Sequence, residues 1–596
     1  MAEDSRELPE TLALDWLKAF GRAASSGDGG AVADLFSADG WLRDRLALTW
    51  DLQTFHGREA IEKVLADRLA DAAISGVVID RFIEPSLEGA EGGTQWVQAA
   101  FRFETAVGRC RGFVRLASSP DSDGWRAWTL LLELVELKGH EERLGARRPL
   151  GVEHGPTRQS EIWPDRRAAQ FEFTDDEPAV IIVGAGQSGL ALAARLGELG
   201  VGTLVLERHD RVGDGWRKRY RTLVLHDPIH ANHLPYLPFP ETWPRFIPKD
   251  KLADWFEAYV SILELNVWTA SSVADSSWDE ASGTWTVRVK RGDGTERVFH
   301  PRHLVVATGT SGLPWTPIID GMDDFHGEMY HSSRYRGGDG MEGKRVLVLG
   351  AGNSGHDIAH DLAEAGAEVT MLQRSRTHVM GSQNGFSVLH AGVYEQDGLD
   401  IDDADFLADS LPLPVVFDLH RSLVNPAIFA MDKPVHDALR AVGYEIDDEH
   451  GIVELFLTRG GGYYIDVGAA AAIANGRIRI RSRCQVDHFT ADGAVFTDGS
   501  EAEYDHVILC TGYGNMREVV RQVLGDDVAE RCPLAWGVDE GGEVNALWRR
   551  PGHPGLWLMG GNLGLVRHMS RTLALQIKAI EVGLIERSPV ATGASA

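Results

Sequence analysis

The sequence predicts an α/β protein with two parallel βαβ units, preceded by a smaller α+β domain. Three observations predict this fold class. From Ala179 onward, short apolar runs alternate with helical segments, and glycine-rich turns directly follow two of those runs. Residues 10–138 instead place helical segments ahead of a series of strand-like runs. Alternating strands and helices are typical of a parallel sheet, whereas helices followed by strands indicate a separate α+β domain.

Composition and charge exclude several classes of protein. The chain has 596 residues, with 59 Lys and Arg against 88 Asp and Glu, and a net charge of −29. This acidic balance argues against nucleic-acid or anionic-membrane partners, because phosphate binding requires a concentrated basic surface. No apolar run reaches the roughly 20 residues that span a bilayer, and the start lacks a signal-peptide pattern. We therefore expect a cytoplasmic protein without a transmembrane segment.

The cysteines are too few and too scattered for a structural or redox centre. Only four occur, and none forms a CxxC pair: Cys110, Cys484, Cys510 and Cys532. Disulfide frameworks and zinc sites need sets of closely spaced ligands, and dithiol redox centres need the CxxC pair. We therefore expect no metal site, and a disulfide reductase is disfavoured.

Residues 10–138 form the predicted N-terminal domain. They begin with an amphipathic stretch at 12–20, whose apolar spacing suits a helix packed on another element. They end with strand-like runs that indicate an antiparallel sheet, at 96–103, 112–116 and 126–135. Residues 139–178 are charged and contain several prolines, so we expect a linker there.

The first glycine-rich turn, Gly184-Ala-Gly186-Gln-Ser-Gly189, lies between an apolar run at 179–183 and a helical segment at 190–199. In such a turn the first glycine makes the bend, the second lets a pyrophosphate approach the backbone, and the third lets helix and strand pack closely. Glu207 ends the next strand, at a spacing where a carboxylate accepts hydrogen bonds from ribose hydroxyls. Together these features predict dinucleotide binding.

The same unit recurs at Gly350-Ala-Gly352-Asn-Ser-Gly355, between an apolar run at 344–349 and a helical segment at 356–365. Here the acid is missing, and the next strand continues as Gln373-Arg374-Ser375-Arg376. A carboxylate would repel a 2′-phosphate, whereas a guanidinium can pair with it through charge-assisted hydrogen bonds. The alternative is that Arg374 and Arg376 only solvate the end of a strand.

Because an acid follows the first turn and arginines follow the second, we assign FAD to the first turn and NADPH to the second. Hydride would then pass across a crevice between the two domains. The predicted FAD-site residues are Gly184, Gly186, Gln187, Ser188, Gly189, Glu207, Arg208, Gly215 and Trp216. The predicted NADPH-site residues are Gly350, Gly352, Asn353, Ser354, Gly355, Arg374, Ser375 and Arg376. We expect residues 179–324 and 513–596 to form the FAD-binding domain, and residues 325–512 to form the NADPH-binding domain.

A further motif lies between the turns. The segment Phe325-His-Gly327-Glu-Met-Tyr-His331-Ser-Ser-Arg-Tyr335 matches the FxGxxxHxxx(Y/F/W) pattern of the flavin-containing monooxygenases. Residues 306–309 and 510–513 resemble the paired ATG segments of that family, and residues 213–216 resemble its GGxW turn. The resemblance covers residues 179–582. It implies that the motif holds the connection between the two nucleotide domains, through Phe325, Gly327, His331 and Tyr335.

Within that family the chain is most similar to the plant YUCCA-type branch. Residues 225–240 resemble that branch's LHLPK…LPxxPFP run, and residues 464–468 resemble its LDVG segment. Asp227 and Ile229 replace an apolar residue and a lysine of the run, so the branch's decarboxylation of 2-oxo acids does not transfer directly. The Baeyer–Villiger relatives are similar too, but they carry Trp-Pro where this chain has Tyr335-Arg336.

The resemblance implies an FAD- and NADPH-dependent monooxygenase. NADPH would reduce the flavin, and dioxygen would add at its C4a carbon. The resulting hydroperoxide would insert one oxygen atom into a small organic substrate, namely a soft nitrogen or sulfur nucleophile, a ketone or a 2-oxo acid. The candidate catalytic residues are Asn232 and His226, the latter where many members carry an asparagine near the reactive carbon. The alternative for both is a backbone-capping role in a proline-rich loop.

Other interpretations stay open at this point. They are a Baeyer–Villiger-type monooxygenase, an NADPH oxidase or reductase without oxygen insertion, and a binding module whose catalysis is vestigial. The apolar, proline-interrupted segments 411–417 and 424–431 either line the substrate entrance or form core helices.

Residues 39–50 and 54–58 resemble the SnoaL-like cone fold, a curved sheet capped by helices. In enzymes of that fold, histidine and aspartate side chains face a pocket, so the resemblance makes Asp44 and His56 candidates. The alternative, which we favour, is that this domain has lost catalysis and serves dimerisation or substrate capture. A homodimer through this domain is accordingly one expectation.

Overall fold

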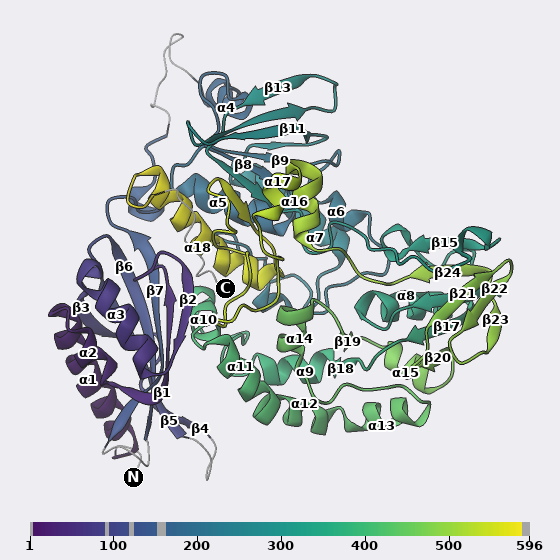
Figure 1. Ribbon diagram of the computed structural model, residues 1–596, viewed down its shortest axis with the longest axis horizontal. Helices are drawn as coiled ribbons and strands as arrows, with labels where there is room; N and C mark the ends of the chain where they lie inside the picture. The colour runs from purple at the N-terminus through teal and green to yellow at the C-terminus, as the bar shows by residue number, and fades with distance from the viewer. Residues whose placement is uncertain (1–3, 90–94, 119–123, 152–161, 587–596) are drawn as a thin grey trace.

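The computed structural model describes residues 4–89, 95–118, 124–151 and 162–586. The purple N-terminal domain packs against the side of a larger body, which has an upper part and a lower right part (Figure 1). No helix among these residues is long and apolar enough to cross a membrane.

The N-terminal domain is a mixed sheet with helices on one face. The sheet order is β2-β1-β7-β6-β5-β3, with β4 beside β5. The strands are β1 (Phe36–Arg45), β2 (Leu52–His56), β3 (Ser75–Asp80), β4 (Ser86–Gly89), β5 (Gln95–Glu104), β6 (Gly108–Ser118) and β7 (Trp125–Leu137). The three strand runs expected to form an antiparallel sheet do so, since β5 pairs with β6 and β6 with β7 in antiparallel register. The whole sheet is mixed, however, because β1 and β7 pair in parallel. A helix and several strands separate them, which supplies the long crossover that a parallel pair requires.

The two faces of this sheet are covered differently. Helices α1 (Asp4–Ser25), α2 (Gly29–Ala33) and α3 (Arg58–Ala72) cover one face. There alternate strand residues form the core of the domain, including Val97, Ala99, Phe101, Val114, Leu116, Leu130 and Leu132. On the other face Ala100, Phe113 and Leu131 pack against Phe406 and Leu407 of α10 (Ile401–Ala408). The second face is therefore buried against the larger body.

The upper part of the larger body contains the first βαβ unit. Its sheet order is β10-β9-β8-β14-β25, and all its pairs are parallel. The strands are β8 (Val180–Val183), β9 (Thr203–Leu206), β10 (Val267–Trp268), β14 (His303–Val306) and β25 (Leu556–Leu558). Helices α5 (Gln187–Glu198) and α18 (Leu563–Glu581) pack against each other. Strand β25 and α18 bring the end of the chain back to this unit.

The lower right part contains the second βαβ unit. Its sheet order is β15-β24-β16-β17-β20, again with parallel pairs. The strands are β15 (Glu328–His331), β16 (Arg345–Leu349), β17 (Glu368–Gln373), β20 (Ile478–Ser482) and β24 (His506–Leu509). Helix α8 (Asn353–Glu364) follows β16. Two parallel sheets with crossover helices are of Rossmann type, which confirms the α/β part of the predicted fold class.

A helical segment lies between β18 (His378–Gly381) and β19 (Tyr463–Asp466). It comprises α9 (Ser382–Leu389), α10, α11 (Leu413–Leu419), a π-helical turn (His420–Val424), α12 (Asn425–Met431), α13 (Lys433–Ala441) and α14 (Ile452–Arg459). In Figure 1, α10 and α11 lie beside the N-terminal sheet. The expected linker likewise contains a helix that the sequence did not predict, α4 (Trp163–Glu172).

Candidate active site

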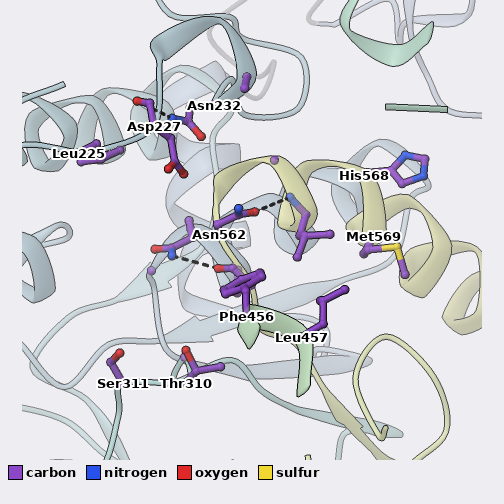
Figure 2. A pocket seen from close by; sticks show the side chains of 18 of the residues that line it. Leu225, Asp227, Asn232, Thr310, Ser311, Phe456, Leu457, Asn562, His568 and Met569 are labelled. Carbon is purple, nitrogen blue, oxygen red and sulfur yellow. Dashed lines mark hydrogen bonds between the residues drawn. The ribbon is translucent and has the colours of Figure 1, made fainter. Parts of the chain in front are cut away.

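A cavity of about 1300 Å³ lies between the two βαβ units and the N-terminal domain. Its wall includes the first glycine-rich turn, the start of α8, part of α14 and the first two turns of α18. Figure 2 shows Asp227 and Asn232 at the top of the view, Asn562 below them, and His568 and Met569 farther along α18. Segments far apart in the sequence therefore face one space.

The glycines of the first turn are required by close backbone contacts. Gly184 has φ +111°, and a Cβ there would lie 2.7 Å from the carbonyl oxygen of Ala307. A Cβ on Gly189 would lie 1.9 Å from the carbonyl oxygen of Gly184. A Cβ on Gly186 would meet nothing within 4 Å, so the space before the start of α5 is open. Helix N-termini of this kind bind anions through free N–H groups and the helix dipole.

The remaining predicted FAD-site residues lie around this space. Glu207 is buried, and its carboxylate accepts hydrogen bonds from the backbone N–H groups of Ala185 (3.0 Å) and His209 (2.9 Å). Of the nine predicted residues, Gly189 alone lies outside the cavity wall, which includes Gly184, Gly186, Gln187, Ser188, Glu207, Arg208, Gly215 and Trp216. The segment 308–312 lines the same wall, although no cofactor contact was expected there from the sequence.

The second turn repeats the geometry of the first. Gly350 has φ +117°, with a Cβ position 2.3 Å from the carbonyl oxygen of Cys510, and a Cβ on Gly355 would lie 2.1 Å from the carbonyl oxygen of Gly350. Asn353 and Ser354 line the large cavity, whereas Gly350, Gly352 and Gly355 do not. The Asn353 side chain accepts a hydrogen bond from the N–H of Ile465 at 2.9 Å, which fixes the start of α8 to β19.

The three residues after β17 are exposed at the edge of the second unit, outside the cavity wall. Arg376 pairs with Glu449 at 2.9 Å, so its guanidinium is partly neutralised. Arg374 forms no ion pair with any residue in the described ranges. Between the two predicted arginines, Arg374 is therefore the one whose charge is free to bind an anion, with Ser375 beside it.

His226 lies on the cavity wall between the two units. Its Nε2 is 3.2 Å from Oδ2 of Asp357 in α8, which also accepts a 2.6 Å hydrogen bond from the Tyr220 hydroxyl. Burial alone would lower the pKa of His226, but the hydrogen bond and charge of Asp357 outweigh it, so the pKa is raised above its ordinary value. The hydrogen bond between His226 and Asp357 therefore joins the predicted catalytic loop to the second βαβ unit.

Asn232 also lines the cavity, and its side chain caps the loop that carries it. Its Nδ2 donates to the backbone carbonyls of Asp227 (3.3 Å) and Pro228 (3.2 Å). The Asp227 carboxyl faces the same cavity, and burial raises its pKa. The two interpretations of Asn232, cavity residue and backbone cap, are thus compatible with each other.

The motif at 325–335 lies outside the cavity wall. His331 Nε2 is 2.9 Å from the carbonyl oxygen of Gly512, and its ring is 5.2 Å from that of Tyr513. Tyr335 donates to Asp361 of α8 at 2.6 Å. Gly327 closely approaches the backbone of residue 505, and Phe325 packs on Phe489. The contacts of His331 with residues 512 and 513 hold together the two chain segments that connect the βαβ units.

The N-terminal candidates Asp44 and His56 do not line the large cavity. Asp44 accepts hydrogen bonds from the backbone N–H groups of residues 47–49, and burial raises its pKa to about 6. The His56 ring stacks on Trp41, with centroids 3.9 Å apart. Other residues of this domain, which no sequence motif marked as candidates, line the cavity: Arg43, Ile83, Glu88, Trp96, Gln98 and Arg115.

Of the two apolar segments, only 411–417 contributes residues to the cavity wall. Leu411, Leu413, Val416 and His420 line the cavity. Leu413 and Val415 are buried as well. The first segment is therefore both a packed helix, α11, and part of the cavity wall.

Comparison with known proteins identifies the family. The family model for flavin-binding monooxygenase-like proteins matches residues 177–419. The indole-3-pyruvate monooxygenase YUCCA1 of Oryza sativa subsp. japonica is 35% identical over 351 residues, which cover 59% of this chain and 80% of that protein. The probable indole-3-pyruvate monooxygenase YUCCA4 of Arabidopsis thaliana is 33% identical over 342 residues, covering 56% of this chain and 75% of that protein.

A solved structure supports the fold. The open crystal structure of cyclohexanone monooxygenase aligns with a TM-score of 0.50 and 16% identity, covering 70% of this chain and 90% of that one. At this identity the likeness concerns the fold alone. With the sequence relatives and the two glycine-rich turns, it leads to one conclusion: the chain belongs to the flavin-binding monooxygenase-like family and is a flavin-containing monooxygenase.

Proposed function

We propose that this enzyme uses FAD and NADPH to insert one oxygen atom from dioxygen into a small organic substrate held in the large cavity. The observation that carries the proposal is that both glycine-rich turns meet at one cavity of about 1300 Å³. The first turn contributes most of its residues, and the second contributes Asn353 and Ser354. A cofactor on each turn would therefore extend toward the same space.

The first turn has features that fit FAD. The open position beside Gly186 leaves room for a pyrophosphate at the start of α5. Glu207 stands at the end of β9, where ribose hydroxyls can donate to its carboxylate. Thr308 lines the cavity, and its buried hydroxyl has no hydrogen-bond partner among the described residues. A buried hydroxyl of this kind is stabilised when a ligand supplies its partner.

The second turn has features that fit NADPH. Gly352 leaves the start of α8 open, because a Cβ at that position would lie 3.8 Å from its nearest neighbouring atom. Oδ1 of Asp357 is buried on the cavity wall and accepts no hydrogen bond from the described residues. Arg374 offers a guanidinium to a 2′-phosphate, and Ser375 offers a hydroxyl beside it.

When both cofactors are bound, NADPH supplies the hydride and the flavin supplies the activation of dioxygen. This chain's own residues position the reactants and exclude water. The pKa of His226 is raised, because the hydrogen bond and charge of Asp357 outweigh the effect of burial. A raised pKa favours the protonated imidazole, which can donate an N–H at the cavity wall. Asn232 keeps its loop closed by capping two carbonyls. Phe456 and Leu457 add apolar surface on the opposite wall (Figure 2).

The relatives and the cavity together suggest the substrate classes to test. The YUCCA relatives are named for indole-3-pyruvate, a 2-oxo acid, and the structural neighbour is named for the ketone cyclohexanone. Asp227 adds a carboxyl to the wall, with a pKa raised by burial. Sulfides and amines belong in the same panel, because a soft sulfur or nitrogen nucleophile can also accept one oxygen atom from dioxygen in a flavin-dependent reaction.

We also propose that residues 10–138 form a SnoaL-like cone domain, and that the expected boundaries divide the rest of the chain. The mixed sheet with helices on one face supports the first proposal. The membership of β25 in the first parallel sheet supports assigning residues 179–324 and 513–596 to one FAD-binding domain. A homodimer through the N-terminal domain and a cytoplasmic location stay predictions from the sequence.

The test is NADPH consumption by the purified yellow holoenzyme, with hydrogen peroxide measured alongside. The panel holds a sulfide, an amine, a ketone and a 2-oxo acid. We expect at least one compound to stimulate NADPH oxidation and to lower the peroxide formed per NADPH. A protein that binds no flavin, or one that returns all reducing equivalents as peroxide with every compound, would contradict the proposal and favour a binding module or an oxidase.

A further inference from the structure

The N-terminal sheet presents a cluster of nitrogen donors to the large cavity. Gln98 of β5 is paired in register with Arg115 of β6, and Trp96 lies two residues before Gln98 on the same face. All three residues line the cavity. Their face is the one that packs toward α10, opposite the face covered by α1 and α3. Trp96 Nε1 and Arg115 Nη1 are buried and have no hydrogen-bond partner among the described residues.

Arg115 carries a positive charge that its surroundings do not balance. The side chain is 5% exposed, with Cζ 4.6 Å from the centroid of the Phe113 ring. Its Nη2 donates to the Ser410 hydroxyl at 2.9 Å, which supplies no charge. Burial lowers the pKa of Arg115 to about 9, and Glu88 is the only charged group among the described residues that opposes this effect. Glu88 is exposed and forms no ion pair with Arg115 in the described part of the chain.

The other carboxylates near this wall are already paired. Asp409 and Glu543 bind Arg43. Asp405 binds Arg567. On the same strand as Arg115, Arg111 binds Asp403. Buried charges in proteins are normally paired, because an unpaired one is costly to remove from water. The unpaired guanidinium therefore marks a place where a bound anion would be stabilised.

Helix α18 runs along the wall of the same cavity, starting beside the first glycine-rich turn. Gln187 of the first turn donates to the carbonyl of Gly561 at 3.3 Å, next to the N-cap residue Asn562. Asn562 and Met569 both line the cavity. At 1.5 Å per residue they lie about 10 Å apart along the helix axis. Leu407, Ala408 and Leu411, which flank Ser410 in the sequence, add apolar surface to the same cavity wall.

We infer that Arg115, with Trp96 and Gln98, forms an anion-binding subsite in which the N-terminal domain holds the terminal carboxylate of an elongated, apolar substrate. The inference rests on the proposed function, because it places the other end of that substrate at the flavin. A guanidinium and an indole N–H donate to a carboxylate, and the apolar wall accommodates the chain between the two ends. The N-terminal domain would then be part of the substrate site rather than an appendage.

Calorimetric titration of the FAD-loaded holoenzyme with decanoate and with decanamide tests the subsite. The two probes share chain length and shape and differ in charge. We expect wild-type protein to bind decanoate at least about tenfold more tightly, since charge-assisted hydrogen bonds contribute at that level. Arg115→Met is expected to weaken decanoate binding about 10- to 100-fold and to leave decanamide binding within about twofold. Arg115→Lys is expected to retain part of the preference.

Arg111→Met is the matched control, because Arg111 lies on the same strand and face but outside the cavity wall. It is expected to keep the wild-type preference. Glu88→Gln removes the carboxylate whose charge acts on Arg115 and is expected to leave decanoate binding unchanged or stronger. Equal binding of both probes to wild-type protein, binding of neither, or equal effects of the Arg111 and Arg115 variants would overturn the subsite. Failed NADPH oxidation with an intact decanoate preference would instead contradict the proposed function alone.

Discussion

Arg43 and Glu543, 500 positions apart in the sequence, form a buried ion pair with two parallel hydrogen bonds. Nε of Arg43 is 2.7 Å from Oε1 of Glu543, and Nη2 is 2.8 Å from Oε2. Thr54 of β2 donates to the same carboxylate at 2.7 Å. Asp409 binds the remaining nitrogen of Arg43. The pair fixes the N-terminal sheet to the segment that leads into β25, beside the large cavity.

Glu543→Gln is therefore expected to destabilise the protein. The substitution leaves a buried guanidinium without its bidentate partner, and removal of one member of a buried pair costs up to about 3–5 kcal/mol. The measurement is the urea midpoint followed by circular dichroism. Arg211→Gln is the control, because the Arg211–Glu257 pair has the same two-bond geometry but is largely exposed. It is expected to cost under about 1 kcal/mol. Equal losses in the two variants would contradict the role of burial.

Two alanine substitutions in the first turn are expected to behave differently. Gly186→Ala adds a methyl group to open space, so the protein is expected to fold while flavin binding falls. Gly189→Ala places a methyl group 1.9 Å from a backbone oxygen, so folding itself is expected to fail. Soluble yield and circular dichroism report folding, and absorbance near 450 nm after FAD reconstitution reports binding. A yellow, fully loaded Gly186→Ala protein would show that the pyrophosphate lies elsewhere.

Arg374→Ala is expected to raise KM for NADPH about 10- to 100-fold, because a charge-assisted contact with the 2′-phosphate is lost. KM for NADH is expected to change less than about twofold. Arg376→Ala serves as the comparison, since Glu449 already engages that guanidinium. We expect a smaller effect on NADPH from this second variant. If neither substitution alters the ratio of the two KM values, both arginines only solvate the end of β17.

His226→Ala is expected to raise hydrogen peroxide formation relative to product. The substitution removes the contact with Asp357 and opens a polar gap at the junction of the two units, where water can enter. The measurement is peroxide formed per NADPH consumed, with the best substrate of the panel. His360→Ala is a suitable control, because that side chain is half-buried on α8 outside the cavity wall. Unchanged coupling in the His226 variant would remove this residue from the mechanism.

The sequence predicted the two nucleotide turns well because their physical reasons are local. Gly184 and Gly350 need positive φ, and Gly189 and Gly355 need room for a backbone oxygen a few residues away. Such constraints act within one βαβ unit and leave a readable pattern. The strands of the N-terminal domain could also be predicted from the sequence, since alternate residues along them are apolar and face the core.

The residues through which the N-terminal domain lines the cavity could not be predicted. It depends on contacts such as that between Arg115 and Ser410, which are 295 positions apart. No local periodicity encodes the docking of one sheet face on α10. The parallel pairing of β1 with β7 was missed for the same reason, because strand order depends on the whole chain. His226 was placed at the cavity from the resemblance, but its partner Asp357 emerged only from the fold.

Incorporation of oxygen from ¹⁸O₂ tests the central claim most directly. The holoenzyme is incubated with NADPH and the compound that best stimulates its oxidation, and the product is analysed by mass spectrometry. We predict one ¹⁸O atom in the product and the second in water, with the reaction dependent on FAD and faster with NADPH than with NADH. Product without the label, or complete recovery of the label as peroxide, would contradict a monooxygenase and identify an oxidase or reductase.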